Sequence, residues 1–376
     1  MATRSWVPVP DGSDFPLQNL PYGVFSRRGE PPRCGVAIGG LVLDLAPVLG
    51  DATFAAPSLN GFLAAGRARW EQVRRSLTAF LSDPSHASDV EPHLIPRQDV
   101  TLHLPVEVAD YVDFYASEQH ATNLGKMFRP DGDALLPNWK HLPVGYHGRA
   151  GTVVVSGTDI VRPSGLTLPG PEHRPSAKLD VEVELGFVVG VGSSLGSPVS
   201  TADFADHVFG VVVLNDWSAR DIQSYEYVPL GPFLGKSFAT SISPWVVPLA
   251  ALERVPAPVQ DPVPAAYLQV AEDWALDIDL ELSRNGEVVS RPPFAGMYWT
   301  APQMLAHMTC NGASLRTGDL FASGTISGDE PDQRGSFIEL TWNTAFLDDG
   351  DVVTISATTG GRYLGEVTAR ILPARP

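Results

Sequence analysis

The sequence predicts a mixed α+β protein, rich in β-strands, with a small N-terminal unit and a larger second one. Its 376 residues exceed the usual size of a single domain. From about residue 106 onward, short β runs are separated by Gly and Pro, a spacing that favours a β-rich domain over βαβ repeats. The preceding segment, residues 83–105, is polar and contains prolines, so we expect it to be the linker.

The first unit, residues 1–105, is expected to combine a β-hairpin with a helix. The stretch GVAIGGLVLDL (35–45) alternates and then runs apolar around Gly39-Gly40, which is typical of two short strands joined by a tight turn. Residues 62–82 predict a helix that ends at Asp83-Pro84. The apolar residues near helical spacing in this stretch are Phe62, Leu63, Trp70, Val73, Leu77 and Phe80.

The second unit, residues 106–376, contains most of the candidate strands. They are short runs rich in β-branched residues, and turns carrying some of the 34 prolines and 35 glycines separate them. The candidate strands are TVVVSG (152–157), DVEVELGFVVG (180–190), FGVVVLND (209–216), LDIDLELSRNG (276–286), SFIELTW (336–342) and DVVTISATT (351–359).

Charge and cysteine content disfavour several classes of function. The net charge of −17 would repel phosphate backbones and anionic membrane surfaces, so we expect neither nucleic acid nor a membrane as a partner. Cys34 and Cys310 are too few for a disulfide framework or a thiolate zinc site. The N-terminus reaches Pro and Asp before a signal-peptide core can form, and there is no apolar run of about 18 residues. We therefore expect a soluble protein of the reducing cytoplasm.

Two carboxylates stand two residues apart in the candidate strand 180–190. Residues two apart on a strand share a face and lie about 6.6 Å apart, so Glu182 and Glu184 can bind one cation. Their oxygen atoms suit Ca²⁺ or Mg²⁺, whereas zinc would usually bring His or Cys into the ligand set. The alternative is that the pair is the solvated face of a strand.

A further carboxylate, Asp216, ends the apolar run FGVVVLN, at a strand end where sites are commonly built. The stretch DWSARDIQ that starts there is expected to be helical, which places Arg220 and Gln223 three residues apart on one face. They could hold an anionic substrate group beside the metal. The alternative for Arg220 is a surface salt bridge to Asp216 or Asp221.

The stretch DYVDFYASEQHATNLGKMFRP (110–130) is interpreted as a helix that begins near Asp113. In such a helix Asp113 and His120 lie two turns apart on one face, with Tyr115 near the N-terminal end. A lone His on a helix is more often structural than catalytic. Acidic, cationic and aromatic residues crowd into 113–149, however, which makes His120 a candidate for a functional role.

Long stretches of the chain resemble the fumarylacetoacetate hydrolase family. They are DFYASEQHATNLGKMFRP, LLPNWKHLPVGYHGRAGTVVVSG, LNDWSARDIQSYEYVPLGPFLGKSFATSISPWVVP and GDLFASGTISG, and the resemblance extends to the N-terminal SDFPLQNLPYGVF. It implies a small SH3-like N-terminal β domain, a larger β-roll catalytic domain and a homodimer. It also implies hydrolysis of 4-fumarylacetoacetate, a dicarboxylate β-diketone, to fumarate and acetoacetate, the last step of tyrosine and phenylalanine catabolism. A His-activated water and a divalent metal that stabilises the enolate leaving group would perform the reaction.

The resemblance further implies roles for individual side chains. His120 matches the general base, and Glu339 matches the acid that orients it. The groups matching the surroundings of the oxyanion are Arg220, Gln223 and Lys236. The residues matching the Ca²⁺ carboxylates are Asp113, Glu182, Glu184 and Asp216, and those matching a Mg²⁺ position are Asp216, Lys236 and Thr240. The residues matching substrate contacts are Tyr115, Arg129, Tyr146, Gln223, Tyr227 and Thr325. Because a protonated ammonium has no lone pair, we expect Lys236 to be a cation near the metal and not a ligand.

Other functions remain open at the level of the sequence. An acylpyruvase, or a decarboxylase or isomerase of an oxo acid, would use the same paired-Glu metal site, although such relatives generally lack the FYASEQHATN and SYEYVPLGPF stretches found here. A non-catalytic acidic metal-binding or interaction protein would need neither a base nor oxyanion donors. A dehydrogenase is disfavoured, since no strand–GxGxxG–helix unit is present.

Overall fold

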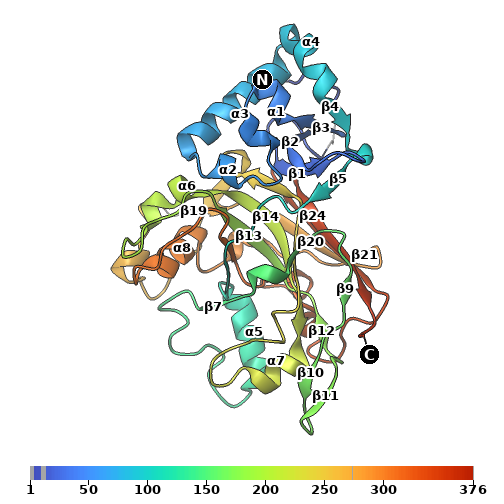
Figure 1. The fold of residues 1–376 in the computed structure, drawn as a ribbon. Helices are drawn as coiled ribbons and strands as arrows, with labels where there is room; N and C mark the ends of the chain where they lie inside the picture. Colours follow the sequence, from blue (N-terminus) through green and yellow to red (C-terminus); the bar gives the residue numbers. More distant parts are fainter. Residues whose placement is uncertain (1–3, 10–13, 273, 376) are drawn as a thin grey trace.

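The molecule consists of a small N-terminal domain on top of a larger domain that contains the C-terminus (Figure 1). The computed structural model describes residues 4–9, 14–272 and 274–375. Part of the N-terminal sequence that argues against a signal peptide, 1–3 and 10–13, lies outside the described residues. The β-rich α+β class expected from the sequence is confirmed. Within the described ranges, no helix has both the length and the hydropathy that crossing a membrane requires.

The N-terminal domain is built on antiparallel strands in the order β4-β3-β2-β1, and β5 pairs with the far end of β1. Short helices and the longer α3 lie beside this sheet (Figure 1). The strands are β1 (Tyr22–Ser26), β2 (Arg33–Ile38), β3 (Leu41–Asp44), β4 (Leu94–Pro96) and β5 (Thr101–His103). The helices are α1 (Leu45–Leu49), α2 (Asn60–Leu63), α3 (Arg67–Ser82) and α4 (Ala87–Val90).

The expected hairpin is confirmed, but the rest of the N-terminal prediction needs correction. Gly39 turns the chain between β2 and β3 with a φ of 54°, in the left-handed region that glycine tolerates. The stretch 62–82 is not one helix, because Gly66 has a φ of 83° and separates α2 from α3. Residues 83–105 are not a plain linker either, since they form α4, β4 and β5 and complete the N-terminal sheet.

The main sheet of the second domain continues that of the N-terminal domain. Its path runs β1-β17-β14-β13-β22-β6-β7, with β16 and β8 attached beside β14. At the junction, Gly23 pairs with Trp245, and the indole ring lies so close that a Cβ atom on Gly23 would be 2.6 Å from it. The strands are β6 (Tyr111–Phe114), β7 (Gly145–His147), β8 (Val153–Val155), β13 (Val183–Val189), β14 (Val208–Asp216), β16 (Thr240–Ile242), β17 (Trp245–Pro248) and β22 (Leu320–Ala322).

A second sheet of the larger domain runs in the order β21-β20-β23-β24-β9, and short two-stranded ladders flank it. Its strands are β9 (Ile160–Val161), β20 (Asp279–Arg284), β21 (Glu287–Ser290), β23 (Val352–Thr359) and β24 (Arg362–Leu372). The flanking pairs are β10 (Ser164–Thr167) with β11 (Glu172–Pro175), β12 (Leu179–Asp180) with β15 (Ser218–Ala219), and β18 (Arg254–Pro256) with β19 (Trp274–Leu276). The helices are α5 (Glu118–Phe128), α6 (Phe204–His207), α7 (Arg220–Glu226), α8 (Ala301–Thr309) and α9 (Phe337–Leu340).

Strands β13 and β14 are buried on both faces, which explains their almost continuous apolar sequences. Leu185 and Phe187 belong to the core shared with the second sheet, which contains Leu282 of β20. Side chains of the opposite face, such as Val188 and Leu214, belong to the core shared with the N-terminal domain. Because side chains alternate along a strand, Glu184 and Asp216 lie on this second face. The carboxylates of the site therefore lie at the edge of an apolar core.

Two local predictions near the site are wrong. Residues 110–130 are not one helix: Asp113 lies on β6, and α5 begins only at Glu118 after the capping residue Ser117. Residues 336–342 are not a strand, because α9 (Phe337–Leu340) forms a single helical turn there. In both cases contacts with distant parts of the chain override the local pattern.

Candidate active site

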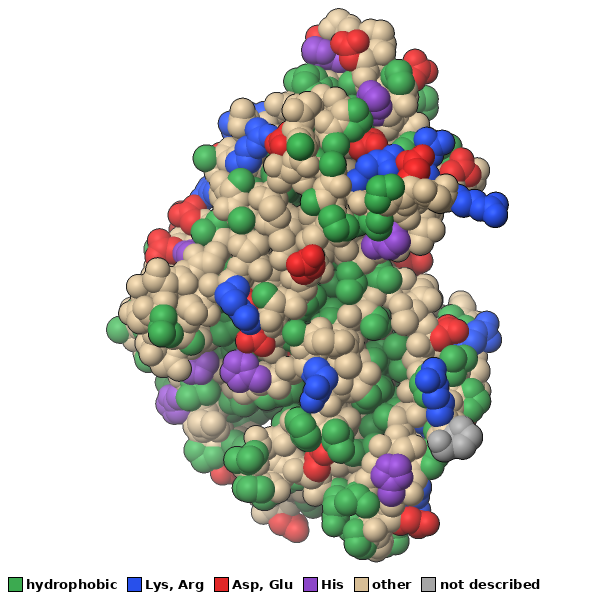
Figure 2. All heavy atoms as spheres, in the orientation of Figure 1, with side chains coloured by type: hydrophobic (Ala, Val, Ile, Leu, Met, Phe, Trp, Pro, Cys, Tyr) green, Lys and Arg blue, Asp and Glu red, His purple; other side chains and the backbone are tan. Residues whose placement is uncertain are grey.

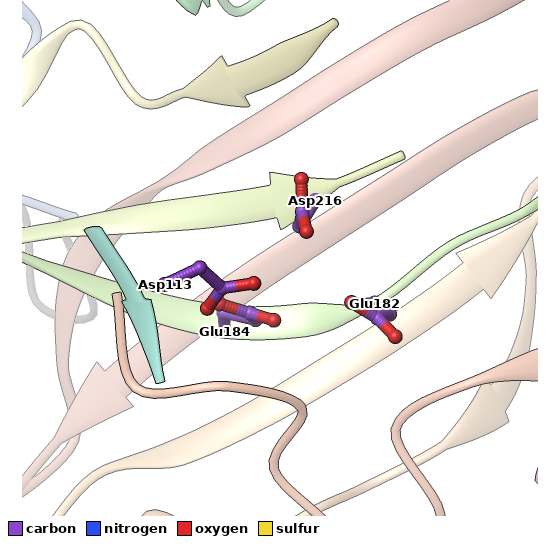
Figure 3. Close-up of side chains that lie close together, drawn as sticks. All are labelled: Asp113, Glu182, Glu184 and Asp216. Carbon is purple, nitrogen blue, oxygen red and sulfur yellow. The ribbon is translucent and has the colours of Figure 1, made fainter. Parts of the chain in front are cut away.

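Three strands and one strand-flanking residue bring four carboxylates together (Figure 3). Asp113 comes from β6, Glu184 from β13 and Asp216 from the end of β14, whereas Glu182 lies just before β13. One oxygen of each lies within 4.8 Å of the others. Each of these residues is at most 4% exposed, so the alternative of a solvated acidic strand face is excluded.

The unpaired oxygens of this cluster fit a divalent cation. Oδ1 of Asp113 and both carboxylate oxygens of Glu184 are buried without a hydrogen-bond partner. Burial raises the pKa of Asp113 and of Glu184 well above the ordinary value, and the neighbouring carboxylates raise both pKa values further. A bound cation would stabilise these buried carboxylates, which otherwise repel one another. Ca²⁺ and Mg²⁺ both prefer oxygen ligands.

Lys236 compensates the other half of the cluster. Its ammonium donates to Glu182 Oε2 and, at 2.8 Å, to Asp216 Oδ2. Burial lowers the pKa of Lys236, but the two carboxylates outweigh burial and raise it overall, so the side chain is protonated. The remaining contacts of Asp216 come from Tyr146 Oη at 2.9 Å and Thr240 Oγ1 at 3.1 Å. Lys236 is therefore placed as a buried cation beside the carboxylates, and its ammonium offers no lone pair to a metal.

Arg220 opens the expected helix, α7, and is buried at 7% exposure. The surface salt bridge considered for it is wrong: Nε donates to Asp180 at 2.8 Å, and Nη2 lies 2.8 Å from Glu182 Oε1. The expected neighbour Gln223 accepts from Nη1 at 3.3 Å. Burial raises the pKa of Glu182, but Lys236, Arg220 and the imidazole of His120 outweigh burial and lower it overall.

His120 and Glu339 form a buried pair. His120 is the third residue of α5, and its Nδ1 lies 2.6 Å from Glu339 Oε2 of α9. Burial would raise the pKa of Glu339, but His120 and further donors, including Asn123 and Ser336, lower it to about 2. Asn123 Nδ2 donates at 2.9 Å and Ser336 Oγ at 2.7 Å. The carboxylate is thus ionised and holds one imidazole nitrogen, which leaves the other to act.

The residues expected to contact substrate differ in burial. The Tyr115 ring packs edge-on against His120 with 5.2 Å between ring centroids, and Thr325 Oγ1 is buried without a partner. Burial raises the pKa of both Tyr115 and Tyr146, and nearby carboxylates contribute to the rise. Arg129 is exposed and donates to the carbonyls of the 133–134 turn, while Tyr227 is 54% exposed. The expected substrate contacts therefore combine buried or partly buried side chains with the exposed Arg129 and Tyr227.

Three side chains that organise the site were not predicted from the sequence. Asp180 continues the same alternation as Glu182 and Glu184, so the spacing of acids in DVEVE was a usable signal. Asn123 lies three residues after His120 on α5, a spacing that puts both on one helix face. Ser336 shows no comparable signal, because its partner Glu339 was expected on a strand.

Two sequence models of known families match the chain. The sequence model described as Fumarylacetoacetate (FAA) hydrolase C-terminal matches residues 110–372. The chain belongs to the fumarylacetoacetate hydrolase family. The model described as Fumarylacetoacetase N-terminal matches residues 18–105 of this chain. Together the two matches span both domains of the fold.

Full-length relatives are also similar. The human fumarylacetoacetase is 47% identical over 414 residues, which covers 98% of this chain and 99% of the relative. The fumarylacetoacetase of Arabidopsis thaliana is 46% identical over 417 residues, with 99% of each chain covered. Among solved structures, the fumarylacetoacetate hydrolase of Exiguobacterium antarcticum has a TM-score of 0.60 at 21% identity, covering 95% of this chain and 100% of the other. At that identity the structural likeness shows the fold, whereas the two relatives show the family over its full length.

Proposed function

We propose that this family member hydrolyses the carbon–carbon bond of 4-fumarylacetoacetate and releases fumarate and acetoacetate. The observation that carries the proposal is the buried His120–Glu339 pair beside four clustered carboxylates. Human and plant fumarylacetoacetases that match nearly the whole chain support the choice of substrate. The reaction would be the last step of tyrosine and phenylalanine catabolism.

His120 is the proposed general base. Because Glu339 is ionised and lies 2.6 Å from Nδ1, that nitrogen carries the proton and donates a hydrogen bond to the carboxylate. Nε2 is then the basic nitrogen, able to take a proton from the attacking water, and Glu339 stabilises the imidazolium that forms. Proton transfer of this kind typically contributes about 10²- to 10⁴-fold to the rate.

Arg220, Gln223 and Lys236 are the proposed donors around the developing oxyanion. Arg220 and Lys236 are buried cations held by carboxylates, so their positions are fixed before substrate enters. Fixed donors in a water-poor site stabilise charge at the transition state without a cost of reorganisation. Together with a bound divalent cation, their charges would offset the carboxylates of the site, so that a dicarboxylate can bind to a protein of net charge −17.

We also propose that Asp113, Glu182, Glu184 and Asp216 hold a divalent cation, Ca²⁺ or Mg²⁺, with Thr240 beside Asp216. When bound, such an ion supplies Lewis-acid polarisation of the diketone oxygens and stabilises the enolate leaving group. Oδ1 of Asp113 and both carboxylate oxygens of Glu184 have no hydrogen-bond partner, so they are free to bind the ion. The proposed substrate contacts are Tyr115, Arg129, Tyr146, Gln223, Tyr227 and Thr325.

The oligomeric state and location belong to the same proposal. We place the chain in the cytoplasm as a homodimer, with the domain limits at 1–105 and 106–376. Hydrophobic side chains gather on the lower part of the face in Figure 2, where Figure 1 places α5, α7 and the β10–β11 hairpin. Leu230 at 97% exposure, Phe233 at 58% and Leu168 at 58% are available to a second subunit. Light scattering of the purified protein tests this part directly.

A substrate panel tests the reaction. Loss of the ultraviolet absorbance of the conjugated diketone should follow addition of 4-fumarylacetoacetate, should stop after chelation and should return with Ca²⁺ or Mg²⁺. His120→Ala should abolish turnover while substrate binding is largely retained. Preferential cleavage of acylpyruvates, or isomerisation or decarboxylation of an oxo acid, would assign the chain to another activity of the family. Full activity after complete chelation would remove the metal from the proposal.

A further inference from the structure

Asp180 is a buried carboxylate to which the proposed reaction assigns no role. It is fully buried at the end of β12, and each of its oxygens accepts two hydrogen bonds. Oδ1 accepts from the backbone N–H of Val181 at 2.9 Å and of Phe337 at 2.8 Å. Oδ2 accepts from Nε of Arg220 at 2.8 Å and from the N–H of Ile338 at 3.2 Å. All four partners are donors, as an ionised carboxylate requires.

Two of these donors belong to the first turn of α9. The first N–H groups of a helix have no partner within it, and the residue before α9, Ser336, provides no side-chain cap because its hydroxyl donates to Glu339. Asp180, 157 residues earlier than Phe337 in the chain, supplies the missing acceptor. The short helix that carries Glu339 toward His120 is thus held at its start by Asp180.

Among the four donors to Asp180, the side-chain donor is Arg220, which belongs to the proposed oxyanion group. Its Nε is fixed on Asp180, while its two other nitrogens reach Glu182 at 2.8 Å and Gln223 at 3.3 Å. The strand pair β12–β15 brings the backbone that leads into Arg220 beside Asp180. One carboxylate therefore contacts both the orienting helix of the base and a donor for the oxyanion.

We propose that Asp180 is a positioning residue that holds Arg220 and the Glu339-bearing turn in a single frame, so that base and oxyanion donor keep their relative places. The isosteric Asp180→Asn cannot reproduce this frame, because an amide has one acceptor oxygen and its NH₂ would face donors. If Asp180 were only a counter-ion for Arg220, the geometry of His120 and Glu339 would not depend on it. That difference makes the proposal testable.

The first measurement is independent of catalysis. The short His120–Glu339 hydrogen bond should give a downfield imidazole N–H proton resonance, identified by its absence in His120→Gln. We expect Asp180→Asn to shift or remove this resonance. Asp180→Glu keeps the buried charge but moves the carboxylate by one methylene, so it serves as a second variant if Asp180→Asn does not fold. Circular dichroism and thermal melting confirm the folded state of each.

The matched control is Asp221→Asn. Asp221 lies on the same helix as Arg220 and accepts hydrogen bonds from Ser176 Oγ at 2.6 Å and the Ala177 N–H at 2.8 Å, and no hydrogen bond or ion pair joins its side chain to α9. We expect Asp221→Asn to leave both the downfield resonance and kcat within threefold of wild type. It therefore controls for loosening of the N-terminus of α7 alone.

The second measurement is kinetic and rests on the proposed function. Both Asp180 variants should lower kcat by about 10²-fold or more, since losing one positioned oxyanion donor already costs that much. A variant that keeps the resonance, or keeps kcat within threefold, would overturn the proposal. If Asp180 holds both Arg220 and the turn that carries Glu339, its loss must change the resonance and kcat together. If the wild type did not cleave 4-fumarylacetoacetate, the proposed function would fail, while the resonance would still decide the positioning role.

Discussion

Replacing Glu339 by Gln gives the sharpest test of the proposed base. The substitution keeps shape and a hydrogen-bonding group but removes the charge 2.6 Å from His120 Nδ1. The pKa of Glu339 is lowered from 4.5 to about 2, and His120 is the largest of the causes that lower it. That shift means that the surroundings stabilise the ionised carboxylate over the protonated form by roughly 3 kcal/mol. If most of it stabilises the imidazolium at the transition state, kcat falls about 10²-fold.

The assay is the loss of diketone absorbance at saturating substrate, with kcat and KM determined separately. KM should change little, because Glu339 contacts His120 and its neighbours and not the proposed substrate groups. The control is Glu118→Gln on α5, the helix of His120, whose carboxylate forms a partly exposed ion pair with Lys140 at 2.6 Å; kcat should stay within twofold. Turnover of Glu339→Gln within tenfold of wild type would refute the assignment of His120 as a Glu339-oriented base.

Three further predictions concern the carboxylate cluster and the domain junction. Glu184→Gln should raise the melting temperature of the chelated protein at neutral pH, because burial and the neighbouring carboxylates raise the pKa of Glu184, and a carboxyl whose pKa rises on folding destabilises the folded state above its unfolded pKa. It should also weaken the stabilisation by Ca²⁺; a lower melting temperature in EDTA would contradict this. Lys236→Met should destabilise the chelated protein by about 3–5 kcal/mol and the Ca²⁺-loaded protein by less, as denaturant titration can measure. Gly23→Ala should cost about 1–3 kcal/mol of unfolding free energy with kcat unchanged, because the new Cβ would meet the Trp245 ring at 2.6 Å. Gly40→Ala, with no atom within 4 Å, is the control and should be neutral.

Much of the site could be predicted where local sequence and strand geometry agree. Glu182 and Glu184 stand in an alternating strand pattern, and the structure places both in one buried carboxylate group. Asp216 was expected at a strand end and occupies the last position of β14. Arg220 and Gln223 were expected on one helix face and are hydrogen-bonded there. These features depend on neighbours within about four residues, which sequence patterns report well.

The errors share one physical origin. Residues 110–130 contain a helical pattern, but Asp113 belongs to β6 because the backbone there pairs with β22, a strand about two hundred residues later. The 336–342 stretch has strand-forming residues, yet Asp180 accepts from the N–H groups of Phe337 and Ile338 and the turn becomes helical. Hydrogen bonds between distant segments decided these elements, and local propensity is too weak to oppose them.

The sequence by itself determined the β-rich class, the turn at Gly39 and the acids of the central strand, because each follows from spacing and composition over a few residues. Only the tertiary structure decided that Lys236 neutralises Glu182 and Asp216, that Asp180 joins Arg220 to α9, and that one sheet runs through both domains. Those contacts join residues far apart in the chain. Their free energy comes from buried charges and donors finding partners only after the strands have assembled, so no local pattern encodes them.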